Sequence, residues 1–151
     1  MRITWATASR SFTYPATITV DTAGFSLVTF SDVPEAGTDA ETHEEALCAA
    51  PDALIAALGG YIEARRPIPP PSPVHPGQVM VVLPVLVVAK LALYEAMRTA
   101  TVTNTELGRR LGISEGAVRR LVDLDHRSHI GQVEAALAAL GRRLVVDVNA
   151  A

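Results

Sequence analysis

Residues 104–123 read NTELGRRLGISEGAVRRLVD, two short helical patterns joined by a Gly-Ile-Ser sequence. A helix-turn-helix needs two short helices that cross steeply at a tight turn, with small residues at the crossing. Gly108 has no Cβ atom where the helices would approach, and Gly112 can adopt the positive φ of the turn. We expect Ile113 to fill the corner and Ser114 to cap the second helix. Four apolar side chains are expected to face inward, namely Leu107, Leu111, Val118 and Leu121.

The polar residues around this turn suit DNA recognition. Arginine can donate two hydrogen bonds to guanine, and glutamate can accept one from cytosine. Five residues of the second helix and its cap are candidates for base contacts: Ser114, Glu115, Gly116, Arg119 and Arg120. Three arginines are better placed for phosphates, which hold register without reading sequence: Arg109, Arg110 and Arg127. The alternative is an ordinary helical hairpin with a solvated arginine face.

Charge is divided unevenly along the 151 residues. Residues 1–84 contain four arginines and nine acidic residues, a net charge of −5. Residues 85–151 contain nine basic and seven acidic residues, a net charge of +2. Such asymmetry suggests two domains with different partners. We expect an N-terminal extension at residues 1–13, a first domain at 14–84 and a DNA-binding domain at 85–151.

The start of the first domain predicts strands. Two runs that are rich in β-branched and aromatic residues flank the sequence TAG, and they predict a hairpin with strands at 16–21 and 25–30. The acidic, turn-rich stretch that follows, up to residue 41, has room for a short third strand.

A helix is predicted next. Thr42 and Glu45 have the spacing of a capping box, and an apolar stripe follows them at helical spacing. Pro51 lies inside the stripe and removes a backbone hydrogen bond, so we expect a kink or a break into two helices. Cys48 has small, apolar neighbours, and we expect its thiol to be buried.

Residues 65–76 contain six prolines and predict an extended loop. The apolar run 78–83 predicts a strand, and because no charged residue occurs from 67 to 89 we expect this strand in the centre of the sheet. From Pro84, a suitable first residue of a helix, the chain reads as helical. Its end, RLVVDV at 143–148, alternates like a short strand. The whole pattern predicts an α+β chain, in which a domain of strands and one helix precedes an all-α helix-turn-helix domain that ends in this strand.

The helical half resembles the phage-repressor-like helix-turn-helix family. More narrowly, the chain resembles the HicB antitoxin family through the strings YPATITVD, GFSLVTFSDVPEAGT, LPVLVVAKLALYEAM and ELGRRLGISEGAVRRLVDLDHRSHIGQVEAALAALGRRL, which span residues 14–148. In that family a β-β-β-α-β domain that resembles a partial ribonuclease H fold precedes the DNA-binding domain. The resemblance implies that the first domain binds and blocks HicA, a small toxin that cleaves messenger RNA, and that the second domain represses the operon.

A toxin that grips RNA must present a basic face, and an acidic domain can be drawn to that face. Four acidic residues of the first domain are candidates for this attraction: Asp32, Glu35, Asp39 and Glu41. Three neighbours are candidates for the apolar centre of the contact: Phe30, Val33 and Pro34. The alternative is that the acids only keep a small domain in solution.

Catalysis and metal binding are not predicted. A nuclease of the ribonuclease H type needs several carboxylates that converge on two metal ions. The acids of the first domain are instead explained as turn formers and as first-turn helix charges. His126 and His129 form an H-x-x-H pair, but no further ligand lies close to them in sequence. We therefore expect no enzymatic activity, no cofactor and no metal.

The lone Cys48 excludes an internal disulfide and suits a reducing cytoplasm. The longest apolar run is broken by Pro84 and Lys90 and is shorter than the roughly 20 residues of a membrane span. We expect a cytoplasmic protein that does not bind membranes and whose partners are a HicA-type toxin, operator DNA and a second copy of itself, as a homodimer or a tetramer. The alternative function is a one-component transcription regulator whose N-terminal domain senses a small molecule.

Overall fold

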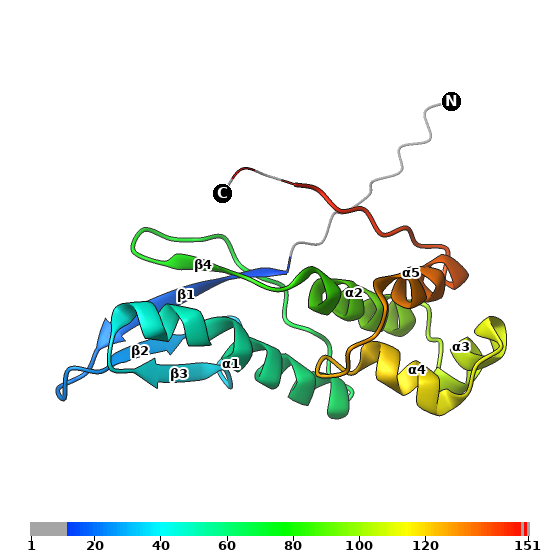
Figure 1. Ribbon diagram of the computed structural model, residues 1–151, viewed down its shortest axis with the longest axis horizontal. Coiled ribbons are helices and arrows are strands. Elements are labelled where there is room, and N and C mark those ends of the chain that lie inside the picture. The colour runs from blue at the N-terminus through cyan, green and yellow to red at the C-terminus, as the bar shows by residue number, and fades with distance from the viewer. Residues whose placement is uncertain (1–11, 149, 151) are drawn as a thin grey trace.

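The structure is a computed structural model that describes residues 12–148 and 150. A sheet with one long helix on it is followed by a group of shorter helices (Figure 1). The strands are β1 (Thr13–Val20), β2 (Ser26–Thr29), β3 (Gly37–Ala40) and β4 (Val79–Val82). The helices are α1 (His43–Glu63), α2 (Val85–Thr99), α3 (Asn104–Leu111), α4 (Glu115–Val122) and α5 (Ile130–Ala139). The predicted α+β class and the order β-β-β-α-β are therefore confirmed.

The sequence predicts an N-terminal extension at residues 1–13. Residues 1–11 of it lie outside the described residues. Its last two residues belong to the fold. Phe12 is buried in the core and Thr13 is the first residue of β1. Within the described residues, Phe12 and Thr13 are therefore part of the sheet and its core rather than of an extension.

The sheet is antiparallel, with the strand order β3-β2-β1-β4. The second half of β1, residues 17–20, pairs with β2, whereas its first half, residues 13–16, pairs with β4. The prediction that residues 78–83 form a central strand is wrong, because β4 lies at the edge. Only half of β1 pairs with β2, and β4 pairs with the half that remains. The absence of charge from β4 did not determine this position.

α1 covers one face of the sheet (Figure 1). The predicted capping box is confirmed: the Glu45 N–H donates to Thr42 Oγ1 at 3.2 Å, and the Thr42 N–H donates to the Glu45 carboxylate at 3.3 Å. The buried side of the helix consists of Ala46, Ala50, Leu54, Leu58 and Tyr61. By length and composition alone α1 could cross a membrane, but this buried stripe packs within the protein as that of a core helix does.

Two expectations for α1 are wrong. The helix runs unbroken from His43 to Glu63 through Pro51. Pro51 forgoes one backbone hydrogen bond, but Ala50 and Leu54 are buried on either side of it, and this packing keeps both halves helical. Cys48 is exposed. It lies two residues from Ala46, which places it about 200° around the helix from the buried stripe.

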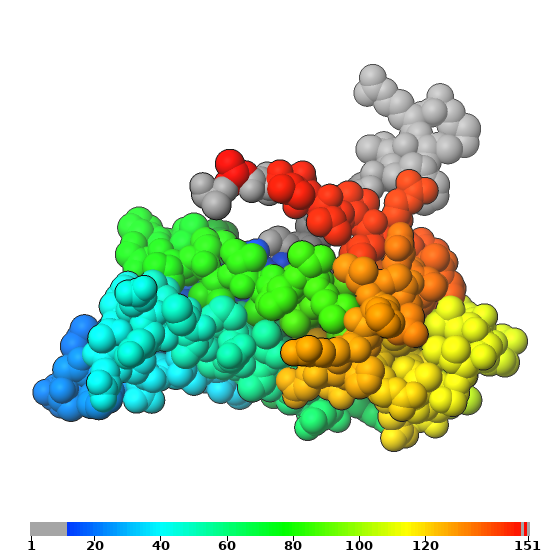
Figure 2. All heavy atoms as spheres, in the orientation of Figure 1, coloured from blue at the N-terminus to red at the C-terminus, as the bar shows by residue number. Residues whose placement is uncertain are grey.

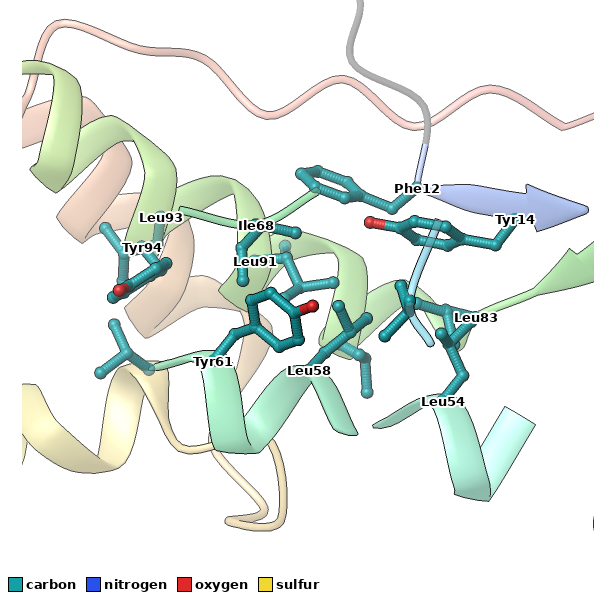
Figure 3. Close-up of a cluster of buried hydrophobic side chains, with 14 of the residues drawn as sticks. Phe12, Tyr14, Leu54, Leu58, Tyr61, Ile68, Leu83, Leu91, Leu93 and Tyr94 are labelled. Atoms are coloured by element: carbon teal, nitrogen blue, oxygen red, sulfur yellow. The ribbon is translucent and has the colours of Figure 1, made fainter. Parts of the chain in front are cut away.

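The proline-rich loop connects the sheet to α2. As predicted, residues 65–76 form no strand or helix. Three hydrogen bonds tie the loop to α2: Tyr94 Oη to the Arg66 carbonyl at 2.9 Å, Arg98 Nη1 to the Arg65 carbonyl at 2.7 Å, and the Ile68 N–H to Glu95 Oε1 at 3.0 Å. Ile68, Leu91 and Tyr94 lie in one buried cluster with side chains of β1 and α1 (Figure 3). The division into separate domains at residues 14–84 and 85–151 stays a prediction.

The predicted C-terminal strand is wrong for the single chain. Residues 142–148 follow α5 without strand pairing, and Figure 2 shows this segment standing away from the body of the molecule. Val145, Val146 and Val148 are 74%, 55% and 89% exposed. A strand requires the backbone of a partner strand, and none lies beside this segment among the described residues.

Candidate nucleic-acid interface and protein-binding face

The turn between α3 and α4 has the tight geometry that the sequence predicts. A Cβ atom on Gly108 would lie 2.7 Å from the Ile113 carbonyl oxygen and 3.5 Å from Val118 Cγ2. Gly112 has a φ of +68° and ends α3 in the left-handed conformation. Both predicted glycine roles are confirmed. The close crossing of the two helices depends on the missing side chain of Gly108.

The corner of the turn is filled differently from the prediction. Leu107, Val118 and Leu121 are buried as expected, and Leu111 is half-buried. Ile113 is 39% exposed, so the prediction that it fills the corner is wrong. Its backbone carbonyl already occupies the space beside Gly108, and the Val118 side chain lies next to it. The Ile113 side chain consequently points out to the surface.

Both helices begin at a side-chain cap. Ser114 Oγ accepts a hydrogen bond from the Ala117 N–H at 3.1 Å, as predicted. Thr103 Oγ1 accepts from the Glu106 N–H at 3.2 Å. The Glu106 carboxylate does not accept a hydrogen bond from the Thr103 N–H, as it would in a capping box. It accepts instead from Arg109 Nε and Nη2, both at 2.9 Å, and from Arg110 Nε at 2.8 Å.

All eight residues predicted to contact DNA are exposed: Ser114, Glu115, Gly116, Arg119, Arg120, Arg109, Arg110 and Arg127. They lie on α3, α4 and the loop after α4, at the opposite end of the molecule from the β1–β2 hairpin (Figures 1 and 2). Arg119 is paired with Glu115 at 2.7 Å. Arg120 and Arg127 form no ion pair with any residue that the structure describes.

The two arginines of α3 hold Glu106 in its ionised form. Their hydrogen bonds lower the pKa of Glu106 from 4.5 to about 2, and the same contact raises the pKa of Arg109. The stabilisation from these pairs is therefore present at any pH above 4.5 and is lost only as the pH falls towards 2. Near neutral pH, a phosphate that approaches Arg109 or Arg110 must compete with this carboxylate.

We therefore expect Glu106→Gln to strengthen binding to DNA of any sequence, because it frees two arginines. The logarithmic dependence of affinity on salt should steepen by about one to two. Fluorescence anisotropy with a labelled duplex at several salt concentrations measures both quantities. Glu134→Gln, at an exposed position of α5, removes the same charge away from α3 and is the control. An unchanged slope in Glu106→Gln would mean that Arg109 and Arg110 do not contact phosphates.

A groove of about 300 Å³ lies beside α4. Its walls come from α3, α4, α5 and the loops between them, and they include Ile113, Arg120, His126, Ser128 and Gln132. The alternative function assigns small-molecule sensing to the N-terminal domain, and this groove is in the other half of the chain. Among the described residues, no group of three or more His, Cys, Asp or Glu side chains is arranged to hold a metal ion.

Two of the residues predicted to contact the toxin are buried in the protein itself. Phe30 is 2% exposed and Val33 is 0% exposed, and both belong to the core. Their prediction as contact residues is wrong, because an apolar side chain in a short loop can face either a partner or its own core. Pro34, which lies between Val33 and Glu35, is exposed.

The four predicted acids have different environments. Asp39 and Glu41 are exposed. Asp32 Oδ2 accepts hydrogen bonds from the Ser72 N–H at 2.9 Å and from Ser72 Oγ at 3.0 Å. Glu35 accepts from Tyr61 Oη at 2.6 Å and from Arg66 Nη1 at 3.1 Å. Asp32 and Glu35 thus tie their loop to α1 and to the proline-rich segment.

Arg66 and Tyr61 are neighbours of Glu35 that the sequence did not reveal. The Arg66 guanidinium lies 4.0 Å from the centre of the Tyr61 ring, and both side chains contact Glu35. The hydrogen bond from Tyr61 is the main cause that lowers the pKa of Glu35, and the same bond raises the pKa of Tyr61. These residues lie 26 and 31 positions from Glu35, so no local pattern links them.

Comparison with known proteins identifies the class. Residues 13–92 match a family described as the HicB_like antitoxin of bacterial toxin-antitoxin systems. The chain is 40% identical to Antitoxin HicB 2 of Photorhabdus laumondii, across 90% of this chain and 96% of that protein. It is 39% identical to Antitoxin HicB of Escherichia coli K12, across 87% and 95%, and 40% identical to Antitoxin HicB of Pseudomonas fluorescens, across 80% and 84%.

The fold and these similarities define an antitoxin of a bacterial toxin–antitoxin system. The chain belongs to the HicB-like antitoxin family.

Proposed function

We propose that this antitoxin has two activities. Residues 14–84 bind and block a HicA-type toxin that cleaves messenger RNA, and residues 85–151 bind operator DNA through α3 and α4 and repress the operon. One observation supports this proposal most: exposed arginines surround the tight α3–α4 turn. They do so in a chain that matches HicB antitoxins over most of its length. We further propose that the first domain is related to ribonuclease H without being an enzyme, that the α3–α4 unit is a phage-repressor-like helix-turn-helix, and that the protein acts in the cytoplasm.

The DNA-binding form that we propose is a homodimer on an inverted repeat, with half-sites one helical turn or a multiple of it apart. The exposed segment 142–148 is a candidate for pairing with its twin as an intermolecular ribbon. Its exposed valines support this proposal over packing on its own helices. Two dimers that join to form a tetramer are the second candidate assembly.

The toxin contact that we propose is centred on β3 and the residues on either side of it, which include Pro34, Asp39 and Glu41, with Asp32 and Glu35 beside them. An acidic surface raises the rate at which a basic partner associates, more than it raises affinity. Because Phe30 and Val33 are buried, the apolar part of the contact reduces to Pro34 and its exposed neighbours.

Neutralising Asp32, Glu35, Asp39 and Glu41 together should slow association with the toxin about tenfold at low salt and weaken its salt dependence. The dissociation rate should change little. Stopped-flow or surface plasmon resonance at several salt concentrations measures both rates. Because Asp32 and Glu35 have internal partners, the double variant Asp39→Asn, Glu41→Gln should show a large part of the effect without disturbing the loop.

The control for this experiment is the double variant Glu44→Gln, Asp52→Asn, which removes the same charge from exposed positions of α1. It should associate at nearly the wild-type rate. Association of the quadruple variant at the wild-type rate would show that the acids only keep the domain in solution.

A direct test separates the proposed function from the alternative. The first step is to establish whether a short, basic reading frame adjoins the gene; the full chain is then mixed with the product of that frame, and messenger RNA cleavage is measured. The same chain is titrated against a duplex from its own promoter. We expect stoichiometric inhibition of cleavage and specific binding of the duplex. Binding of the duplex without any effect on cleavage, and its release by a small metabolite, would favour the one-component regulator.

A further inference from the structure

Lys90 is the one charged residue that is fully buried among those that the structure describes. It lies in the middle of α2, with an exposed fraction of 0%. An ammonium group removed from water is strongly destabilising unless acceptors replace its hydration. The acceptors around Lys90 therefore indicate why the charge is there.

Those acceptors are three backbone carbonyls at one place. Lys90 Nζ donates to the carbonyls of Arg120 at 2.9 Å, Asp123 at 2.5 Å and His126 at 2.7 Å. Arg120 lies in the last turn of α4, Asp123 follows its last residue, and His126 lies in the loop to α5. The last carbonyls of a helix have no partner within the helix and carry the negative end of its dipole. Lys90 thus caps the C-terminal end of α4 from another helix, with all three donors of its ammonium group.

The surroundings reinforce the contact. Ser128 Oγ donates to the same Arg120 carbonyl at 3.1 Å and lies 3.1 Å from His126 Nδ1. Burial lowers the pKa of Lys90, whereas the carboxylates of Asp123 and Asp125 act in the opposite direction. The carbonyl of Arg120 is therefore held by two donors, while its guanidinium group is exposed at the surface.

We propose that Lys90 is a positioning residue for DNA reading, which fixes where α4 presents Arg119 and Arg120. This proposal rests on the proposed function of α4 as the helix that reads the operator. The buried side chains of Val118 and Leu121 hold α4 against the core, but apolar contacts have no direction. Three hydrogen bonds to one nitrogen are directional and fix the end of the helix. Side chains that form paired hydrogen bonds with a base must be held to within about 0.5 Å.

The test uses the full chain and two duplexes of equal length, one from the promoter of its own gene and one with the same bases in scrambled order. Lys90→Met keeps an unbranched side chain that is one atom shorter and removes its donors. We expect its affinity for the promoter duplex to fall about 10- to 100-fold, the effect of losing one or two base contacts. Affinity for the scrambled duplex should stay within about twofold, because phosphate contacts dominate it.

The control separates positioning from stability. Leu91 is buried next to Lys90 in sequence, but its side chain lies in the cluster with Ile68 and Tyr61 (Figure 3). Leu91→Ala should lower the Tm and leave the ratio of the two affinities unchanged. A folded Lys90→Met variant with the wild-type ratio would overturn the proposal, since Lys90 would then only stabilise the fold.

If Lys90→Met does not fold, Ser128→Ala tests the proposal in its place. This milder change removes only one donor to the Arg120 carbonyl. Its affinity ratio should fall about threefold to tenfold, and an unchanged ratio would overturn the proposal. If the wild-type protein does not prefer the promoter duplex, the proposed DNA reading fails, and the role of Lys90 fails with it. That outcome is seen before any variant is made, so the two failures are distinguishable.

Discussion

Replacing Gly108 with alanine should abolish operator binding and leave inhibition of the toxin intact. The added Cβ would lie 2.7 Å from the Ile113 carbonyl oxygen, which is backbone and cannot rotate away. The crossing of α3 and α4 must then open, at a cost of about 2–4 kcal/mol. Because we propose that side chains held in that crossing read the operator, we expect the affinity for the operator to fall about 100-fold or more.

Gly131→Ala is the matched control for this experiment. Gly131 also lies in a helix, but a Cβ there meets nothing within 4 Å. This variant should bind the operator normally and gain up to about 1 kcal/mol of stability from helix propensity. Circular dichroism and gel-shift assays of both variants provide the comparison. Normal operator binding by Gly108→Ala would contradict a helix-turn-helix in which this close approach is essential.

The second large effect is expected at the arginines of α4. Arg119→Ala or Arg120→Ala should each cost about 1–3 kcal/mol at the base pair that is read, and should relax specificity there. Arg119 must first leave Glu115, whereas Arg120 has no ion-pair partner among the described residues. We therefore expect the larger loss for Arg120→Ala. Binding to a panel of single-base operator variants measures where specificity is lost.

Arg109→Ala is the comparison for these two variants. It lies on α3 and should weaken binding to all sequences alike, with a flatter dependence on salt. If Arg119→Ala and Arg120→Ala both leave operator binding intact at physiological salt, the assignment of α4 to base reading is wrong. If Arg109→Ala changes the preferred base at one position, α3 reads sequence as well.

The contacts of the proline-rich loop matter for how the two proposed activities are divided. Arg66 contacts Glu35 through its side chain and accepts from Tyr94 of α2 through its carbonyl. A partner that binds beside Glu35 would therefore lie two contacts away from α2. The side chains of Leu91 and Tyr94 are buried in the same cluster as Ile68. A fragment that ends at residue 84 would expose this part of the core, so its folding is a demanding test of the predicted domain boundary.

The sequence by itself determined the features whose partners lie within a few residues. Thr42, Ser114 and Gly112 were predictable because a helix cap or a turn depends on backbone groups within about five residues. The apolar stripe of α1 and the exposed arginines of α4 follow from helical periodicity alone. The resemblance to HicB antitoxins was also present in the sequence, in strings that span most of the chain.

Tertiary structure alone decided the features whose partners are distant in sequence. Val33 proved to be core, Ile113 surface and β4 an edge strand, because each depends on which element packs beside it. Lys90 stands among apolar residues of α2. Its charge is explained only by three carbonyls that lie 30 to 36 residues away in sequence and that the fold brings to its ammonium group. Local rules describe a residue by its neighbours along the chain. The burial of a charge or a methyl group depends on its neighbours in space, and these exist only once the helices and the sheet have packed together.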